Sequence, residues 1–96
     1  MEILVAYDVS TQTRAGRRRL RKVATICLGF GQRVQQSVFE CQVTAAQLEE
    51  LEDRLVRTMD QTQDSIRIYR LAEPRQRYLR IHGAKPEFDL REPLIV

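Results

Sequence analysis

The sequence has few of the side chains that metal centres and disulfide-bonded proteins need. It contains one histidine, His82, and two cysteines, Cys27 and Cys41, which lie far apart among apolar neighbours. This spacing matches no metal-binding pattern and is typical of small core residues in a reducing compartment. We therefore expect a cytoplasmic protein whose two thiols are buried and unpaired.

Long apolar runs are also missing. No stretch approaches the ~20 residues of a membrane-spanning helix, and Glu2 stands where an export signal would carry basic residues. The sequence therefore predicts no membrane association. The 96 residues, without repeats or low-complexity tracts, suit one domain with one modest core.

Aromatic residues are scarce, with three Phe, three Tyr and no Trp. An RNA-recognition domain needs aromatic side chains on its central strands to stack on bases. The composition argues against that class of protein.

Positive charge, in contrast, is abundant and clustered. Sixteen Lys and Arg against thirteen Asp and Glu give a net charge of +3 and a pI near 9.2, which favours polyanionic partners. Six of the basic residues crowd into barely more than two helical turns: Arg14, Arg17, Arg18, Arg19, Arg21 and Lys22. A solvated helix face is the ordinary explanation of such a run, and contact with nucleic acid is the functional one.

The first half of the chain predicts a strand, a helix and a strand pair. Residues 3–9 form an apolar run typical of a buried strand, and the apolar residues of 20–30 recur at helical steps. Thr11 or Thr13 can cap this helix, and Gly29 or Gly31 can end it in a left-handed conformation. Short strands follow at 34–36 and 38–43, with a tight bend around residues 36 and 37.

The second half of the chain predicts another helix followed by another strand. Thr44 and Gln47 have the spacing of a capping box, and Leu48, Leu51 and Leu55 mark a buried stripe behind it. Residues 64–71 then alternate as a strand. The element order predicts an α+β fold, a ferredoxin-like βαββαβ sandwich whose antiparallel sheet carries two helices on one face.

The remaining residues predict a tail. We expect a core at 1–72 and a tail at 73–96 with a fifth strand at 78–82, bounded by Gly83 and Pro86. Such a strand needs an edge to pair with, and the uncovered sheet face needs a cover. We therefore expect a homodimer in which the tail pairs with the partner's sheet.

Asp8 is the candidate site residue. A carboxylate near the end of a buried strand must be paired, bound to metal or delivered to the rim of the sheet. An acid that satisfies the following turn is the alternative.

The sequence then resembles a known family. The resemblance is carried by a first strand ending in Tyr7-Asp8-Val9, an arginine-rich helix, Gly31, and the stretch from Arg33 to Glu40 that reads RVQQSVFE. Over residues 3–71 the sequence resembles the CRISPR-associated Cas2 family. The resemblance implies a ferredoxin-like homodimer of prokaryotic adaptive immunity. It also implies two functions, a metal-dependent endonuclease and a subunit of a spacer-capture complex with the Cas1 integrase.

The same resemblance suggests site residues. Asp8 would be a Mg²⁺ ligand, joined by a second Asp8 across a two-fold axis, and catalysis would involve Tyr7, Asp8, Arg33 and Phe39. The residues expected to bind double-stranded DNA or RNA are Arg14, Arg17, Arg18, Arg19 and Arg21. Whether the protein is an enzyme stays open here. The alternatives are a non-catalytic DNA-binding scaffold for the integrase and a VapD-type toxin ribonuclease.

Overall fold

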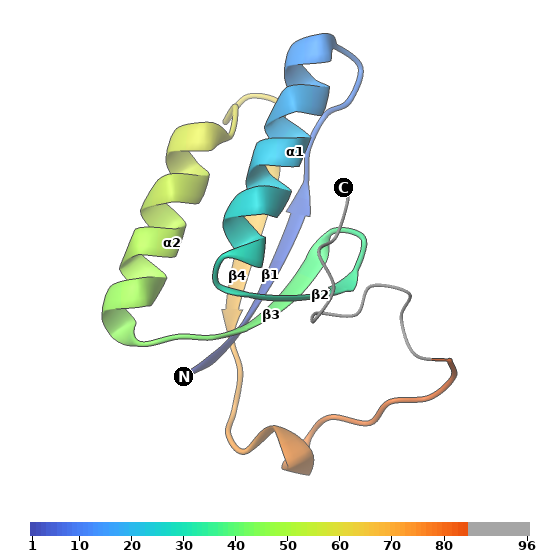
Figure 1. Cartoon of the computed structure of the whole chain (residues 1–96), viewed down its shortest axis with the longest axis vertical. Coiled ribbons are helices and arrows are strands. Elements are labelled where there is room, and N and C mark those ends of the chain that lie inside the picture. Colours follow the sequence, from blue (N-terminus) through green and yellow to red (C-terminus); the bar gives the residue numbers. More distant parts are fainter. Residues whose placement is uncertain (85–96) are drawn as a thin grey trace.

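The computed structural model describes residues 1–84. Its four strands, β1 (Glu2–Asp8), β2 (Gly31–Gln35), β3 (Val38–Gln42) and β4 (Ser65–Arg70), form one antiparallel sheet in the order β2-β3-β1-β4. The helices α1 (Arg14–Leu28) and α2 (Ala45–Thr58) lie side by side on one face of this sheet (Figure 1). The ferredoxin-like α+β fold expected from the element order is confirmed.

Side-chain caps begin both helices. Thr13 Oγ1 accepts a hydrogen bond from Gly16 N at 3.0 Å, and Thr44 and Gln47 form a reciprocal capping box. The end of α1 differs from our expectation. Gly29 has a right-handed helical φ of −72°, and Gly31 already belongs to β2, so no left-handed glycine ends this helix.

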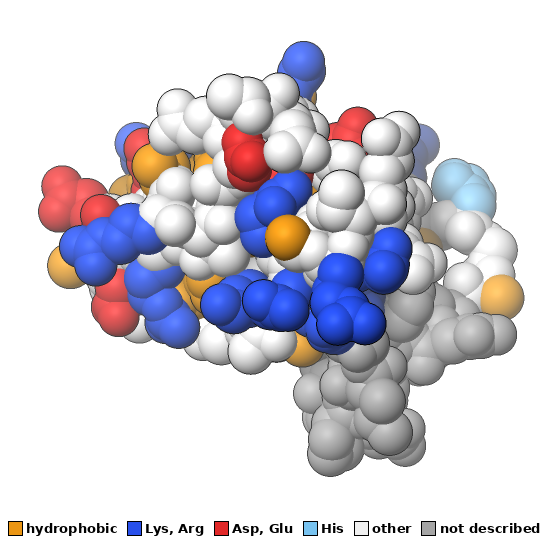
Figure 2. Space-filling view, turned by 90° about the horizontal axis from the view of Figure 1, so that it is seen from above, with side chains coloured by type: hydrophobic (Ala, Val, Ile, Leu, Met, Phe, Trp, Pro, Cys, Tyr) orange, Lys and Arg blue, Asp and Glu red, His pale blue; other side chains and the backbone are white. Residues whose placement is uncertain are grey.

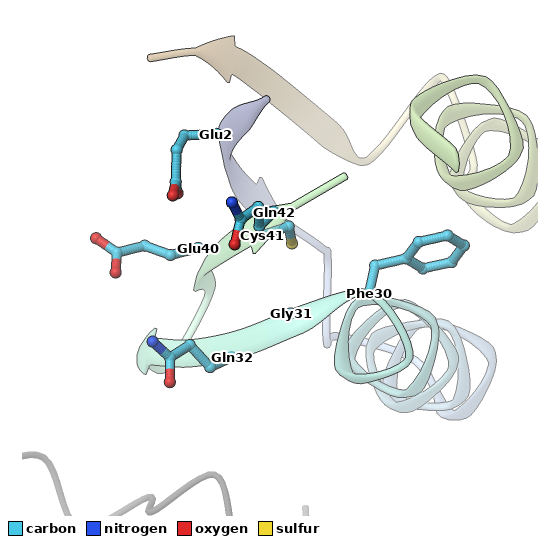
Figure 3. A pocket seen from close by; sticks show the side chains of 7 residues that line it. All are labelled: Glu2, Phe30, Gly31, Gln32, Glu40, Cys41 and Gln42. Carbon is cyan, nitrogen blue, oxygen red and sulfur yellow. The ribbon is translucent and has the colours of Figure 1, made fainter. Parts of the chain in front are cut away.

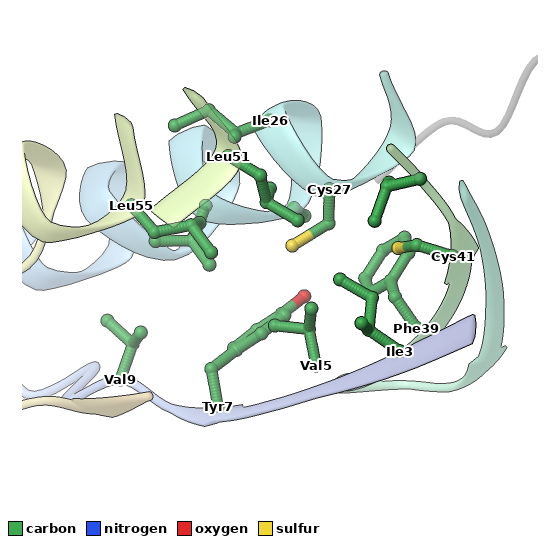
Figure 4. Packing of buried hydrophobic residues seen from close by; sticks show 13 residues of the cluster. Ile3, Val5, Tyr7, Val9, Ile26, Cys27, Phe39, Cys41, Leu51 and Leu55 are labelled. Carbon is green, nitrogen blue, oxygen red and sulfur yellow. The ribbon is translucent and has the colours of Figure 1, made fainter. Parts of the chain in front are cut away.

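The hydrophobic core lies between the helices and the sheet. Ile3, Val5 and Tyr7 point from β1 toward Leu51 and Leu55 of α2 (Figure 4). Cys27 and Cys41 are buried free thiols, as expected. Burial raises the pKa of Cys27 to about 12 and that of Cys41 to about 11, so both stay protonated at neutral pH.

Among residues 1–84, no α-helix covers the opposite face of the sheet. Because successive strand residues point to opposite faces, Leu4, Ala6 and Asp8 of β1 lie on this face, with Val38 of β3 beside Ala6. Leu4, Ala6 and Val38 are only partly buried. We call this surface the open face.

The described part of the tail, residues 73–84, adds no strand to this sheet. Residues Arg75–Arg77 form a short 3₁₀ helix, and residues 78–82 have no regular secondary structure. Within the described part of the chain, the sheet consists of β1 to β4, and none of these strands pairs with a strand at 78–82. The expected fifth strand is therefore absent from the single chain, and its pairing with a second copy stays a prediction. The apolar end at 94–96 lies outside the described residues.

No helix within residues 1–84 has the length and apolarity that crossing a bilayer requires.

Candidate nucleic-acid interface and strand-end acid

Asp8 is the last residue of β1 and lies on the open face. It is exposed and stands opposite Ser65, the first residue of β4. The carboxylate is therefore available to solvent, to a metal ion or to a partner molecule.

The other three residues expected at a catalytic site gather on the covered face. The rings of Tyr7 and Phe39 stack with centroids 6.1 Å apart, and the Arg33 guanidinium carbon lies 5.1 Å from the Phe39 centroid. All three residues are buried. Burial raises the pKa of Tyr7, although the neighbouring Arg33 offsets part of the rise. The structure thus brings Tyr7, Arg33 and Phe39 together and separates them from the carboxylate of Asp8.

This buried cluster fixes the backbone from which Asp8 projects. Tyr7 immediately precedes Asp8, its N–H donates to Ser37 O at 3.1 Å, and its hydroxyl donates to Gln36 O at 3.5 Å. The β1 end is thereby held against the turn between β2 and β3. A catalytic role for the three buried residues stays a prediction, since their side chains lie under the helices.

Exposed arginines occupy the same end of the molecule as Asp8. The strand β1 ends and α1 begins at that end, joined by residues 9–13 (Figure 1). The view onto it shows a row of Lys and Arg side chains (Figure 2). The exposed basic residues of α1 are Arg14, Arg17, Arg18, Arg21 and Lys22. A polyanion lying along this row would contact several guanidinium groups at once.

Arg19 differs from the other α1 arginines because it is engaged within the fold. Its Nε donates to Asp64 Oδ2 at 2.8 Å and its Nη2 to Asp64 Oδ1 at 3.5 Å. Of the residues expected to bind nucleic acid, Arg19 is therefore the one already held by a carboxylate.

Asp64 is an organising residue that our sequence analysis missed. Its side chain is fully buried, and it accepts hydrogen bonds from Ser10 N at 3.0 Å and Asp60 N at 2.9 Å. Burial raises the pKa of Asp64, but the Arg19 guanidinium and two backbone N–H groups lower it by more, so the net pKa lies below the ordinary value. No local sequence signal marks this residue, because its partners come from three separate segments.

The residues around Asp8 supply only part of the ligand set that a magnesium ion needs. Within residues 1–84, no group of three or more His, Cys, Asp or Glu side chains is placed to hold a metal. Asp8 and the Ser65 hydroxyl across from it are one carboxylate and one neutral oxygen. Mg²⁺ is commonly held by one or two carboxylates together with waters and substrate phosphates. A single chain therefore suits a metal that arrives with its substrate or is shared with a second Asp8.

A separate hollow of about 350 Å³ lies at the other end of β1 (Figure 3). Its lining includes Glu2, Gln32, Glu40 and Gln42, with no basic residue. Glu2 and Glu40 point away from the helices. A lining with two acidic and no basic side chains makes this hollow unsuitable for a phosphate chain, which leaves the Asp8 end as the candidate site.

Fold and site together define a class: a small ferredoxin-like α+β protein with an exposed strand-end acid beside a basic helix. Comparison with known proteins identifies the family within this class. Residues 1–78 match the model of the family described as CRISPR associated protein Cas2. The chain belongs to this Cas2 family, which decides against the VapD-type toxin.

Similar proteins support the assignment over the whole chain. A CRISPR-associated endoribonuclease Cas2 of Moorella thermoacetica is 53% identical over 100% of both chains. A CRISPR-associated endonuclease Cas2 of Halalkalibacterium halodurans is 48% identical over 99% of both. The crystal structure of Streptococcus pyogenes Cas2 is 51% identical, with a TM-score of 0.78 over 86% of this chain and 100% of that one.

Proposed function

We propose that this protein acts in CRISPR spacer acquisition as a homodimer that binds double-stranded nucleic acid through α1 and cleaves phosphodiester bonds at Asp8 with Mg²⁺. The observation that carries the proposal is the position of Asp8 at the same end of the molecule as the exposed α1 arginines. Relatives of nearly the same length are named endoribonuclease and endonuclease.

The α1 arginines supply affinity without sequence preference. Guanidinium groups that contact phosphates position a duplex but do not read its bases. Arg14, Arg18 and Arg21 follow the helical step of three to four residues and form one line along α1. In a dimer with two-fold symmetry, the second copy would contribute an equal line of arginines.

Dimerisation supports the Asp8 chemistry. If the open faces of two copies meet, the partly buried Leu4, Ala6 and Val38 gain a cover, and two Asp8 carboxylates face one cavity. A bound Mg²⁺ would polarise the phosphodiester and lower the pKa of the attacking water. Asp8 would hold the ion, and the α1 arginines would stabilise charge that builds on the phosphoryl oxygens.

A non-catalytic scaffold for the Cas1 integrase is the second candidate function. It is favoured by the single carboxylate at the site and by the burial of Tyr7, Arg33 and Phe39 beneath the helices. In this function the dimer fixes the bound DNA while the integrase cuts and joins it.

Two variants separate these functions. Asp8→Asn should reduce Mg²⁺-dependent cleavage on the order of 100-fold or more while duplex binding is kept. The triple variant Arg14/Arg18/Arg21→Ala should weaken binding equally for every sequence and make the salt slope shallower by about 2.7 per chain. Both are measured by cleavage assays and by titrations at several salt concentrations.

Arg54/Arg57/Arg70→Ala is the matched control, since it removes the same charge from α2 and β4. An equal loss of binding in this control would refute the role of α1. Cleavage that is absent from the parent with every metal and pH tried would leave the scaffold function and exclude the enzyme.

A further inference from the structure

The carboxylate of Asp64 holds the chain on both sides of Asp8. Its Oδ1 accepts a hydrogen bond from the N–H of Ser10 at 3.0 Å, and Ser10 is the second residue after Asp8. Asp64 also comes directly before Ser65, the residue of β4 that pairs with Asp8. The segment that follows Asp8 is therefore bonded to the residue that precedes its partner in the sheet.

The same carboxylate is bonded to α1. Arg19 Nε donates to Asp64 Oδ2 at 2.8 Å, and Arg19 Nη2 donates to Asp64 Oδ1 at 3.5 Å. Along α1, Arg19 lies between Arg18 and Arg21, which belong to the line of arginines that the proposed function assigns to phosphate binding. This ion pair therefore ties the line of arginines to the segment that carries Asp8.

The ion pair forms inside a single chain. The Asp64 side chain has no exposed surface and that of Arg19 is 17% exposed, so neither depends on what covers the open face. If Arg19 turned to a phosphate, a buried carboxylate would lose its cation, and such a loss is costly. Arg19 is consequently a poor phosphate ligand, although Arg18 and Arg21 beside it are exposed.

From this geometry, we propose that Arg19 and Asp64 are positioning residues of the Asp8 site and that Arg19 is not one of the phosphate contacts of α1. The pair sets where Asp8, which would hold the metal ion, lies relative to the arginines that would bind phosphates. Cleavage needs both at once, and a displacement of about 1 Å can slow a reaction on the order of 100-fold. The inference rests on the proposed function, because it concerns how that site is assembled.

The first test compares the full chain with Arg19→Gln and Asp64→Asn in Mg²⁺-dependent cleavage of a duplex. Each variant should lower kcat on the order of 10- to 100-fold. KM should stay near that of the parent, because the phosphate contacts remain. The double variant should lose no more than the weaker single variant, since both changes break one ion pair.

The salt dependence of duplex binding shows whether Arg19 touches a phosphate. Arg18→Gln should make the salt slope shallower by about 0.9 per chain, because it removes one phosphate contact. Arg19→Gln should leave the slope unchanged, because its charge is already neutralised by Asp64.

Two controls separate positioning from a general loss of charge or stability. Asp53→Asn removes the same charge from an exposed pair on α2 and should leave kcat unchanged. Leu51→Ala lowers stability from the core of α2, and its folded protein should keep the kcat of the parent. Hydrogen exchange of the Ser10 amide should become about tenfold faster in Asp64→Asn and stay unchanged in Asp53→Asn.

The inference is overturned if Arg19→Gln keeps the kcat of the parent or changes the salt slope as much as Arg18→Gln. It is also overturned if Leu51→Ala lowers kcat as much as Asp64→Asn, which would mean that lost stability explains the effect. These outcomes leave the proposed function standing, because the parent still binds and cleaves. A parent that does not bind or does not cleave would overturn the proposed function and this inference with it.

Discussion

At the scale of the residue, the clearest contrast is between two ion pairs. Asp64 is fully buried and takes hydrogen bonds from Arg19 and two backbone N–H groups, whereas Asp53 and Arg57 form a pair whose side chains are 55% and 77% exposed. An exposed pair contributes little because water screens it. Removing one member of a buried pair is costly because the other charge loses its partner.

We therefore expect Asp64→Asn to lower the free energy of unfolding by about 3 kcal/mol at pH 7, while Asp53→Asn costs under ~0.5 kcal/mol. Since the pKa of Asp64 is lowered in the folded protein, its contribution is present above the unfolded pKa, near 4, and is lost as the pH falls through the folded value. Urea denaturation from pH 7 down to pH 2 measures both effects. A difference between parent and Asp64→Asn that stayed constant over this range would contradict the explanation.

At the scale of the element, the first turn of α1 depends on Gly16. A Cβ at this position would collide with the Ser10 carbonyl oxygen, so α1 packs tightly on the connection that follows Asp8. Gly29 is the C-cap residue of α1 and has a φ of −72°. A Cβ at Gly29 would lie 3.3 Å from the Ile26 carbonyl oxygen, which is tight but not a collision. The two glycines of one helix thus differ in the space around them.

Gly16→Ala should destabilise the protein by about 1–3 kcal/mol, although alanine is the better helix former by ~1 kcal/mol. Gly29→Ala should change stability by less than ~1 kcal/mol, because its backbone conformation suits any residue. Chemical denaturation of both variants gives the comparison. If the Gly16→Ala and Gly29→Ala variants were equally stable, the close approach of α1 to residue 10 would not contribute to the free energy of unfolding.

The secondary structure was largely predictable at this scale. Apolar periodicity and the caps at Thr13 and Thr44 depend on residues within one or two turns, so the sequence contains them. The left-handed end of α1 was predicted wrongly, because a glycine permits that conformation without requiring it.

At the scale of the whole molecule, the tail is joined to the N-terminal end of β1 where it leaves the sheet. The N–H of Leu71 donates to Glu2 O at 2.9 Å, and Glu73 Oε1 accepts from Glu2 N at 3.0 Å. The chain beyond Pro74 adds no strand to the sheet within the described residues. We expect it to pair with a second copy.

Removing residues 75–96 should therefore convert a dimer to a monomer in analytical ultracentrifugation. This cut keeps Glu73 and its contact with β1, so the core should still unfold cooperatively. The full-length chain at the same concentrations is the control. A truncated protein that sedimented as a dimer would show that the open faces associate without the tail.

The candidate site was predictable only in part. Strand alternation places the adjacent residues Tyr7 and Asp8 on opposite faces of the sheet, and this local pattern is present in the sequence itself. The register between β1 and β4 could not be read from the sequence, so the position of Ser65 opposite Asp8 emerged only from the fold.

The sequence by itself determined the family, the order of the elements and the end of the chain where positive charge collects, because these depend on local pattern and composition. Only the tertiary structure decided which of the α1 arginines form an ion pair within the fold and which are exposed to solvent. Arg19 looks like its neighbours along α1, yet Asp64 holds it from 45 positions away in the chain. Burial and pairing depend on which segments meet in space, and that choice is made when the sheet and helices pack together.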